Sequence, residues 1–357
     1  MWAQATAEAL HRRGSPVTLF GSGLLDTACP YERICTLRRE HPLWRTRVDW
    51  GRRYAWEQSL FALMLSWRLR RGRSEIVHTG DPQVAWGMHR RSRRHLSTVI
   101  YKDGLLLGPD WNRHFDWVQV LAPHYLDAGK SAGLDTGRWR VIPHFIELSR
   151  FRTRQSKAEI RERLLGTALP PGAKLVLAAG ALAARSNKRL DWIVREVSEV
   201  PEAHLLVVGQ AEPADEFAFE AMARPLLNGR LHLRTNLLPE AMPACFQAAD
   251  LFAHAALQEP FGIVLIEALA AGLPVLGHTF PVTRWIIGSG GESLDMEARG
   301  ALAATIKTWL ASPDRLRELG DAAGDRARKE FSPEVILPRY EAMYADIGAW
   351  RRSGQRP

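Results

Sequence analysis

Glu259-Pro-Phe-Gly-Ile-Val-Leu-Ile-Glu267-Ala-Leu-Ala-Ala-Gly272-Leu-Pro274 is the stretch of sequence that decides the fold. Between its two inner glycines the run is apolar apart from Glu267, which predicts a helix buried against a sheet. Gly272 and Pro274 predict where the helix ends, because glycine readily adopts the left-handed conformation and proline cannot continue a helix. The first backbone N–H groups of such a helix have no intrahelical partner, so its start is suited to bind a phosphate.

Glu267 is a carboxylate within this apolar helix, where an unpaired charge is costly or becomes protonated. It follows Gly262 by five residues, which is about 7.5 Å along a helix axis and close to the reach from a diphosphate to a ribose. A carboxylate there could accept both hydrogen bonds of a vicinal diol, and Glu259 could do the same for hydroxyls beyond the phosphates. In the alternative interpretation a core arginine neutralises Glu267, and Glu259 is merely solvated.

This stretch resembles the E-x7-E motif of retaining glycosyltransferases of the GT-B fold, family 4 in particular. The resemblance continues, in the order and spacing of that family, from residue 141 to the C-terminus. It rests on residues 141–151, 175–182, 187–193, 204–209, 237–240 and 246–252. It implies an α/β fold with two Rossmann-like, doubly wound parallel-sheet domains facing across a cleft, and a C-terminal helix that crosses back to the first domain.

The domain organisation follows from alternating strand and helix patterns, which favour parallel sheets. With the roles that the resemblance implies, we expect an N-terminal acceptor-side domain over 1–146, a C-terminal nucleotide-sugar donor-binding domain over 147–333, and a crossover helix with its tail over 334–357. Tyr340, Met343, Tyr344 and Ile347 are spaced to bury one face of that last helix. Helices are expected at 2–13 and 56–70, and strands at 17–20, 76–79, 98–101, 118–121, 141–142, 175–179, 205–208, 231–233, 251–253 and 275–276.

The first domain departs from the family at its N-terminus, because residues 2–13 predict a helix where the family has a strand and a glycine loop. We therefore expect the first strand to be missing and strand edges to be left unpaired. A start site assigned too late, or a fragment, would explain this. An upstream reading frame that encodes an apolar strand would support the explanation, and an in-frame stop directly before Met1 would contradict it.

The resemblance assigns catalytic roles to Glu259 and Lys188, whose ammonium would stabilise the charge of the leaving nucleotide. The family often has an arginine directly after the glycine matched to Gly180, whereas this chain has Ala181, so Arg185 is the candidate for a second cation. In the alternative interpretation Lys188 and Arg185 are surface charges beside a helix start. The residues assigned to donor binding are Glu267, Gly262, Ile263, Phe261, Gly180 and Arg185.

On the acceptor side the candidates are His78 and Lys102, each near the end of a predicted strand. His78 is equally compatible with a structural role, and lysines at strand ends are mostly exposed and without function. Ser289-Gly290-Gly291 predicts a tight turn, with a nucleotide contact as the alternative.

The resemblance implies transfer of a sugar from a nucleoside diphosphate sugar, with retention of configuration, to a glycan, lipid-linked or small-molecule acceptor. The sequence has no Asp-x-Asp pair to hold a metal ion on the diphosphate, so we expect no metal site, no cofactor besides the donor, and metal-independent transfer. Two other functions stay open. One is a GT-B protein that binds nucleotide or polyanion without catalysis, and the other is a nucleotide-sugar epimerase.

The composition is that of a globular protein, with 357 residues, 46% hydrophobic and 24% charged. Cys29, Cys35 and Cys245 are too few and too scattered for a disulfide framework or a zinc site. The sequence has no hydrophobic leader, and no apolar run approaches the roughly 20 residues of a membrane span. We expect a cytoplasmic protein, either free or peripheral at the inner membrane face.

The net charge of +9 lies in the N-terminal part, where residues 1–150 hold 23 Lys and Arg against 14 Asp and Glu. These basic residues are interpreted either as solvated helix ends or as a surface that contacts anionic phospholipid or a phosphorylated acceptor. No nucleic-acid recognition motif accompanies them, so no nucleic-acid partner is expected. The two basic clusters are Arg68, Arg70, Arg71 and Arg73, and Arg90, Arg91, Arg93 and Arg94.

Overall fold

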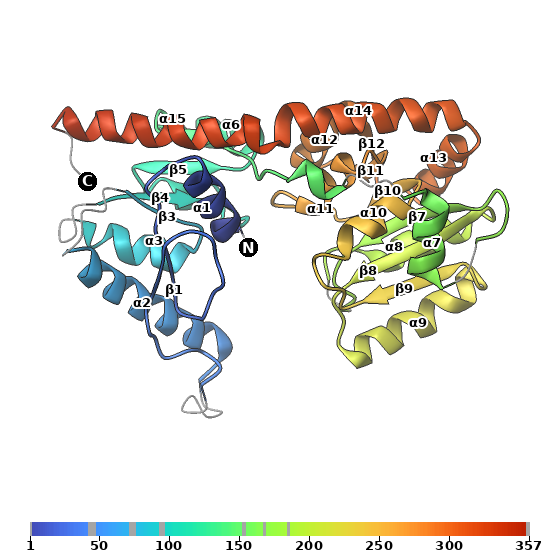
Figure 1. Ribbon diagram of the computed structural model, residues 1–357, viewed down its shortest axis with the longest axis horizontal. Helices are drawn as coiled ribbons and strands as arrows, with labels where there is room; N and C mark the ends of the chain where they lie inside the picture. The colour runs from blue at the N-terminus through green and yellow to red at the C-terminus, as the bar shows by residue number, and fades with distance from the viewer. Residues whose placement is uncertain are drawn as a thin grey trace. The chain divides into compact units, whose positions relative to one another are not determined.

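The computed structural model describes residues 2–41, 48–70, 76–92, 97–151, 155–166, 169–183 and 186–354 (Figure 1). The chain divides into two compact units, Met1–His144 with Ile336–Pro357, and Phe145–Val335. Each unit contains its own parallel sheet. The last helix therefore returns to the first unit, as the crossover of the resembling fold requires.

The main sheet of the first unit has the strand order β3-β4-β5-β6, and all its neighbours are parallel. A separate parallel pair joins β1 to β2. Among the described strands, β1 pairs only with β2, and β3 only with β4 on one side. The strands are β1 (Leu19–Gly21), β2 (Tyr31–Arg33), β3 (Ile76–Thr79), β4 (Thr98–Lys102), β5 (Trp117–Val120) and β6 (Trp139–Val141).

The helices of the first unit cover this sheet and include the last helix of the chain. Helix α2 begins earlier than expected because Asp49 caps it, accepting a hydrogen bond from the Arg52 N–H at 3.0 Å. The expected buried face of α15 is confirmed, since Tyr340, Met343 and Ile347 are fully buried. The helices are α1 (Trp2–Arg12), α2 (Trp50–Leu69), α3 (Pro82–His89), α5 (Pro109–Asn112), α6 (Pro123–Ser131) and α15 (Pro333–Arg352).

The second unit has a six-stranded parallel sheet of order β12-β11-β10-β7-β8-β9. The chain runs outward from β7 to β9 and then returns to the other side of β7 with β10. Such a reversal is the switch point at which open α/β sheets bind ligands. The strands are β7 (Lys174–Ala179), β8 (Ala203–Gly209), β9 (Leu231–Thr235), β10 (Leu251–His254), β11 (Val275–His278) and β12 (Gly291–Leu294).

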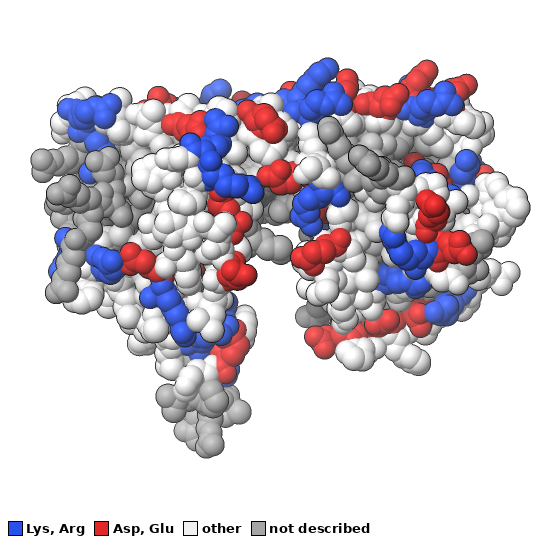
Figure 2. Space-filling view, in the orientation of Figure 1, with Lys and Arg blue, Asp and Glu red and all other residues white. Residues whose placement is uncertain are grey.

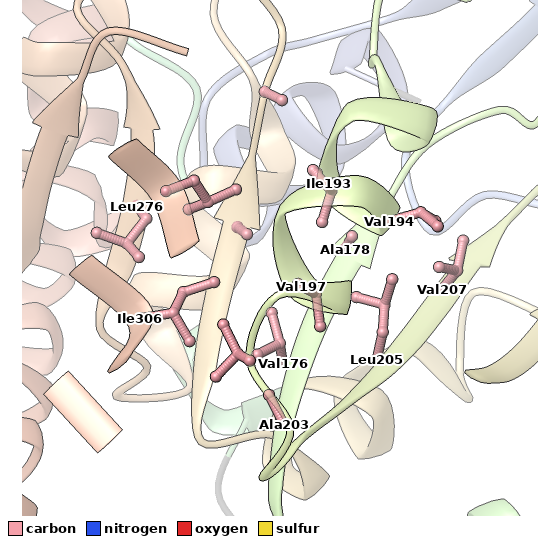
Figure 3. Close-up of a cluster of buried hydrophobic side chains, with 14 of the residues drawn as sticks. Val176, Ala178, Ile193, Val194, Val197, Ala203, Leu205, Val207, Leu276 and Ile306 are labelled. Atoms are coloured by element: carbon pink, nitrogen blue, oxygen red, sulfur yellow. The ribbon is translucent and has the colours of Figure 1, made fainter. Parts of the chain in front are cut away.

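Helices cover both faces of this sheet, which is why its central strands are almost continuously apolar. On one face, Val176, Ala178 and Leu205 pack against the apolar side of α8, as Figure 3 shows. No helix in the described part of the chain is both long and apolar enough to cross a bilayer. The helices are α7 (Lys157–Leu165), α8 (Leu190–Ser198), α9 (Pro213–Leu227), α10 (Met242–Ala248), α11 (Ile263–Ala270), α12 (Pro281–Ile287), α13 (Ala301–Leu310) and α14 (Pro313–Phe331).

The Ser289-Gly290-Gly291 segment forms the end of a short 3-10 helix and the first residue of β12. A Cβ atom on Gly291 would lie 1.9 Å from the Val275 carbonyl oxygen, so only glycine permits this approach of β12 to β11. These glycines therefore shape the sheet edge, which accounts for the turn signal in the sequence.

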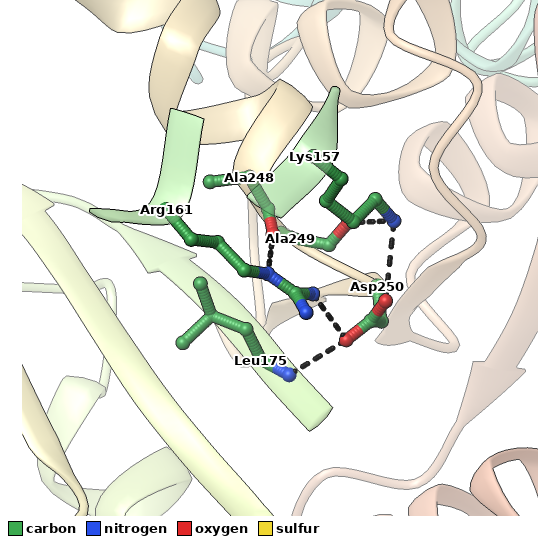
Figure 4. A network of polar contacts seen from close by, with 6 residues as sticks. All are labelled: Lys157, Arg161, Leu175, Ala248, Ala249 and Asp250. Carbon is green, nitrogen blue, oxygen red and sulfur yellow. Dashed lines mark hydrogen bonds and ion pairs between the residues drawn. The ribbon is translucent and has the colours of Figure 1, made fainter. Parts of the chain in front are cut away.

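Asp250 joins three elements of the second unit through charged hydrogen bonds (Figure 4). Its carboxylate accepts from the Arg161 guanidinium at 2.6 Å, from Lys157 Nζ at 3.1 Å and from the Leu175 N–H at 2.8 Å. Burial opposes ionisation, but the two cations more than compensate and hold the pKa of Asp250 below its usual value. This network fixes α7 against the start of β7 and β10.

The basic clusters are only partly within the described residues, which exclude Arg71, Arg73, Arg93 and Arg94. Arg68 forms an ion pair with Glu32 at 2.9 Å. On the face shown in Figure 2, Lys and Arg side chains are interspersed with Asp and Glu.

Candidate active site

The described donor residues lie in the segments that follow β7 and β10, with Ile263 and Glu267 on helix α11. These two strands are hydrogen-bonded neighbours at the reversal of strand order. Because both are parallel, their carboxyl ends meet at the same edge of the sheet. Gly180 directly follows β7, and Glu259 and Gly262 lie in the loop after β10. The sheet topology thus brings the expected catalytic and donor-binding segments together.

Glu259 is the centre of a buried hydrogen-bonded cluster. Its Oε2 accepts a hydrogen bond from Lys188 Nζ at 2.5 Å and another from His254 Nε2 at 3.1 Å. Glu259 is 7% exposed and His254 only 1%. Burial alone would raise the pKa of Glu259, but the hydrogen bonds from His254 and Lys188 outweigh it and lower that pKa. The carboxylate is therefore held in its ionised form.

His254 is a residue of this site that the sequence interpretation missed. It is the last residue of β10 and stacks on Phe252, with ring centroids 6.2 Å apart. The available signal was a histidine within an otherwise apolar strand, five residues before Glu259. Periodicity alone does not distinguish such a histidine from a satisfied core residue.

Gly180 provides the space in which the Lys188 side chain lies. A Cβ atom on Gly180 would be 2.5 Å from Lys188 Cγ, and one on Gly209 would be 1.7 Å from the Gly180 carbonyl oxygen. Real side chains cannot make contacts this short. The two glycines at the ends of β7 and β8 therefore allow the aliphatic part of Lys188 to pass close over the sheet edge.

The start of α11 follows Gly262, which has a φ of +81° and carries no side chain to cap the helix. Among the described residues, no acceptor is hydrogen-bonded to the N–H groups of Ile263 and Val264. Ile263 is 43% exposed, so this helix start is open to solvent. Phe261 differs, because its ring is buried and packs edge-on to Trp285 at 6.4 Å.

Glu267 is a half-buried carboxylate on α11, and no hydrogen-bond partner for it occurs in the described residues. Burial raises its pKa to about 7, an effect that the Arg150 guanidinium only partly offsets. Arg150 lies in a 3-10 helix and donates a hydrogen bond to the Pro239 carbonyl at 3.0 Å. It forms no ion pair with Glu267, so the carboxylate retains its capacity to accept hydrogen bonds from a ligand.

Arg185 lies outside the described residues, and Ala181 is exposed. The neighbouring Arg189 has a positive φ of 51° and donates a hydrogen bond to the Met296 carbonyl at 2.9 Å. Its guanidinium also lies 4.8 Å from the centroid of the Trp192 ring. The guanidinium of Arg189 is therefore already engaged by contacts within the second unit.

No cluster of three His, Cys, Asp or Glu residues suited to a metal ion occurs where the chain is described.

The two acceptor-side candidates lie on neighbouring strands of the first unit, His78 on β3 and Lys102 on β4. His78 Nδ1 is 2.9 Å from the Tyr344 hydroxyl. Burial and the charge of Lys102 lower its pKa to about 3, so its imidazole is neutral. This packing favours the structural interpretation of His78.

Lys102 is buried, contrary to the general expectation for a lysine at a strand end. It is 7% exposed, and its Nζ lies 4.8 Å from the centroid of the Trp2 ring. Burial lowers its pKa to about 8, although the adjacent Asp103 favours the charged form. The general expectation fails because α1 and the loop after β4 close over this strand end.

The two Rossmann-like units and the returning helix define the GT-B fold, and solved structures agree. Sucrose-phosphate synthase from Thermosynechococcus elongatus superposes with a TM-score of 0.81 and 21% identity, covering 97% of this chain and 92% of that chain. Anabaena HepE in complex with UDP superposes with a TM-score of 0.76 and 15% identity, covering 96% and 94%.

Residues 173–312 match the family described as glycosyl transferases group 1, so the second unit carries a domain of that family. This confirms the resemblance drawn from Glu259, Glu267 and their neighbours. The D-inositol 3-phosphate glycosyltransferase of Segniliparus rotundus is 30% identical over 220 residues, which are 57% of this chain and 46% of the relative. The chain spans about half the length of the curated relatives it matches.

Proposed function

We propose that the protein is a retaining glycosyltransferase that uses a nucleoside diphosphate sugar as donor. The observation that carries this proposal is the placement of Lys188, Glu259 and the start of α11 around the switch point of the second unit. An ammonium group and unpaired helix N–H groups together suit a diphosphate. The UDP bound to the structurally similar HepE is consistent with such a donor.

Each residue has a distinct role in the proposed reaction. Lys188 and the N–H groups of Ile263 and Val264 stabilise the negative charge that develops on the diphosphate as its bond to the anomeric carbon breaks. Glu259 accepts hydrogen bonds from donor sugar hydroxyls, and Glu267 accepts those of the ribose diol. A hydroxyl of the acceptor forms the new bond on the same face of the sugar, and its proton leaves with the diphosphate. These charges would allow transfer without a metal ion.

The proposed acceptor is a glycan or a lipid-linked or small hydroxylated molecule. The similar Segniliparus protein is named for inositol 3-phosphate, and a protein of Mycobacterium tuberculosis that is 28% identical over 168 residues is named a phosphatidyl-myo-inositol mannosyltransferase. Both names support a polyol acceptor. We also propose a cytoplasmic protein whose N-terminal half makes peripheral contact with an anionic membrane.

A calorimetric screen of nucleotides and nucleotide sugars against the full chain tests the donor, followed by turnover of the donor that binds. We expect slow donor hydrolysis that Glu267→Ala abolishes and that a chelator leaves unchanged. Tight binding without turnover, even with polyol acceptors, would indicate a non-catalytic protein. Epimerised free sugar would indicate an epimerase, and an inverted product anomer in the NMR spectrum would exclude retention.

A further inference from the structure

Helix α2 carries a stripe of large apolar side chains on its outer face. The stripe consists of Trp56, Leu60, Leu63 and Trp67, which are 66%, 37%, 46% and 53% exposed. Their spacing of four, three and four residues places them on one side of the helix. We call these four residues the α2 stripe.

The α2 stripe is not the side of the helix that builds the core. Ala62, Leu65 and Leu69 occupy that side and are buried in a cluster with α3 and β4. A helix that packs against a core needs only one apolar face, and the α2 stripe is a second apolar face outside the buried cluster. Contiguous exposed apolar surface of this kind marks an interaction site.

A pocket with basic walls borders the α2 stripe. Its volume is about 330 Å³, and it is lined by Ser59, Gln83, Trp86, Gly87, Arg90 and Arg91. Ser59 follows Trp56 by three residues and precedes Leu63 by four, so the pocket adjoins the stripe directly. The pocket lies where α2 and α3 approach closely: a Cβ atom on Gly87 would be 2.7 Å from Ala62 Cβ. Its lining contains two guanidinium groups and no carboxylate.

Several guanidinium groups around the α2 stripe form no ion pair with a described carboxylate. Arg53 and Arg70 lie near the two ends of α2, and Arg90 and Arg91 line the pocket. None of these four pairs with a carboxylate of the described residues, whereas Arg68 is held by Glu32. Within the described residues, the surface therefore combines an apolar centre with a rim of arginines.

We propose that this face of the first unit docks on an anionic lipid bilayer, with the α2 stripe inserted into the interfacial region and the pocket holding a lipid phosphate. Tryptophan prefers the membrane interface, and arginine binds phosphate through paired N–H groups. A second copy of the chain is a poorer occupant, because a two-fold contact would bring two positive rims together. This face is the site of the membrane contact proposed above, and docking there does not depend on glycosyl transfer.

Vesicle co-sedimentation tests the proposal with the full chain and two lipid compositions. Wild-type protein is expected to bind phosphatidylglycerol-containing vesicles and to bind pure phosphatidylcholine at least tenfold more weakly. The variant Trp56→Gln/Trp67→Gln should bind the anionic vesicles at least tenfold more weakly than wild type. Its matched control is Phe217→Gln/Leu238→Gln, which changes two apolar side chains that are 75% and 72% exposed in the second unit and should bind like wild type.

The charge rim has its own pair of variants. Arg70→Gln/Arg90→Gln should lose most of the preference for anionic lipid, whereas Arg315→Gln/Arg317→Gln, which changes exposed arginines on α14, should keep it. Hydrogen exchange provides a readout on the unaltered protein, since vesicles should protect Trp50–Leu69 and leave Pro213–Leu227 unchanged. Donor hydrolysis without vesicles should be equal in all five proteins, which separates this test from that of the proposed function.

Three results would overturn the proposal. One is that wild-type protein does not co-sediment with anionic vesicles. Another is that a stripe variant and its control lose vesicle binding equally. The third is a wild-type dimer in sedimentation velocity that Trp56→Gln/Trp67→Gln converts to a monomer while vesicle binding is unchanged. That outcome would assign the α2 stripe to self-association.

Discussion

Lys188 Nζ and Glu259 Oε2 are 2.5 Å apart, although 71 positions separate the two residues in the sequence. The pair forms because β7 and β10 are neighbours in the sheet. The pair lies in a largely buried place, so neither residue can be removed without leaving an uncompensated charge. The expected phosphate ligand and the expected sugar ligand are thus a single electrostatic unit before any donor binds.

Replacing Lys188 with glutamine should lower kcat/KM for donor turnover about 10²–10³-fold, because it removes the cation that faces the leaving diphosphate. Steady-state kinetics with the donor found by calorimetry measures this. Lys157→Gln is the matched control, since Lys157 also pairs with a carboxylate of the second unit but stands at the other end of the sheet. Retention of full activity in Lys188→Gln would remove Lys188 from the proposed reaction.

Gly180→Ala should lower activity at least tenfold while the protein still folds. The new methyl group would meet Lys188 Cγ at 2.5 Å and push the ammonium away from Glu259. Gly324→Ala is the control, because a Cβ atom there meets nothing within 4 Å and α14 gains from alanine. Equal kinetics of both variants would show that the position of Lys188 does not depend on Gly180.

His254→Phe should shift the acidic limb of the pH–activity profile toward higher pH. The imidazole hydrogen bond helps to lower the pKa of Glu259, so its loss raises that pKa and the carboxylate protonates earlier on acidification. Phenylalanine preserves the stacking on Phe252. A uniform loss of activity at every pH, with no shift of the limb, would mean that His254 serves packing alone.

Glu267→Gln should change the pH dependence of stability. Folding raises the pKa of Glu267 from 4.5 to about 7. At low pH the carboxyl group is neutral in both the folded and the unfolded state and does not lower the stability of the wild-type protein. As pH rises through that interval the buried group must ionise, and the folded state loses stability. The loss is about 3 kcal/mol at most, from about 1.4 kcal/mol for each pKa unit. In urea unfolding at pH 5 and pH 8, the free energy of unfolding of the variant relative to wild type should be higher at pH 8 than at pH 5. If the free energies of unfolding of variant and wild type differed equally at both pH values, burial would not be the cause of the raised pKa of Glu267.

Asp250→Asn should destabilise the second unit by about 3 kcal/mol, because Arg161 would keep a buried charge without its carboxylate. The midpoint of urea unfolding measures the change. Asp325→Asn removes a carboxylate that pairs with Arg328 at 2.7 Å on the exposed side of α14 and should have no measurable effect. Similar midpoints for the two variants would mean that the ion pairs of Asp250 stabilise the protein no more than an exposed ion pair does.

The sequence predicted five strands of the second unit, β7 to β11, to within a few residues, because parallel strands buried on both faces are continuous apolar runs. It did not predict β2 or β12. Three residues in β2 are too few to show a period, and β12 begins at Gly291, directly after Gly290, so the two glycines indicated a turn. The start of α11 was predicted correctly, since the left-handed Gly262 is a local signal.

By itself the sequence determined the order of most elements and the residues that flank their ends, since these follow from local periodicity and turn chemistry. It also indicated the GT-B class, through its resemblance to a known family. Only the tertiary structure decided that Lys188 is paired with Glu259, that His254 supports this pair and that Lys102 is buried. It also decided that α2 exposes a second apolar face to solvent. Burial and charge depend on which distant segments exclude water from a side chain, and strand pairing across the sheet sets those neighbours.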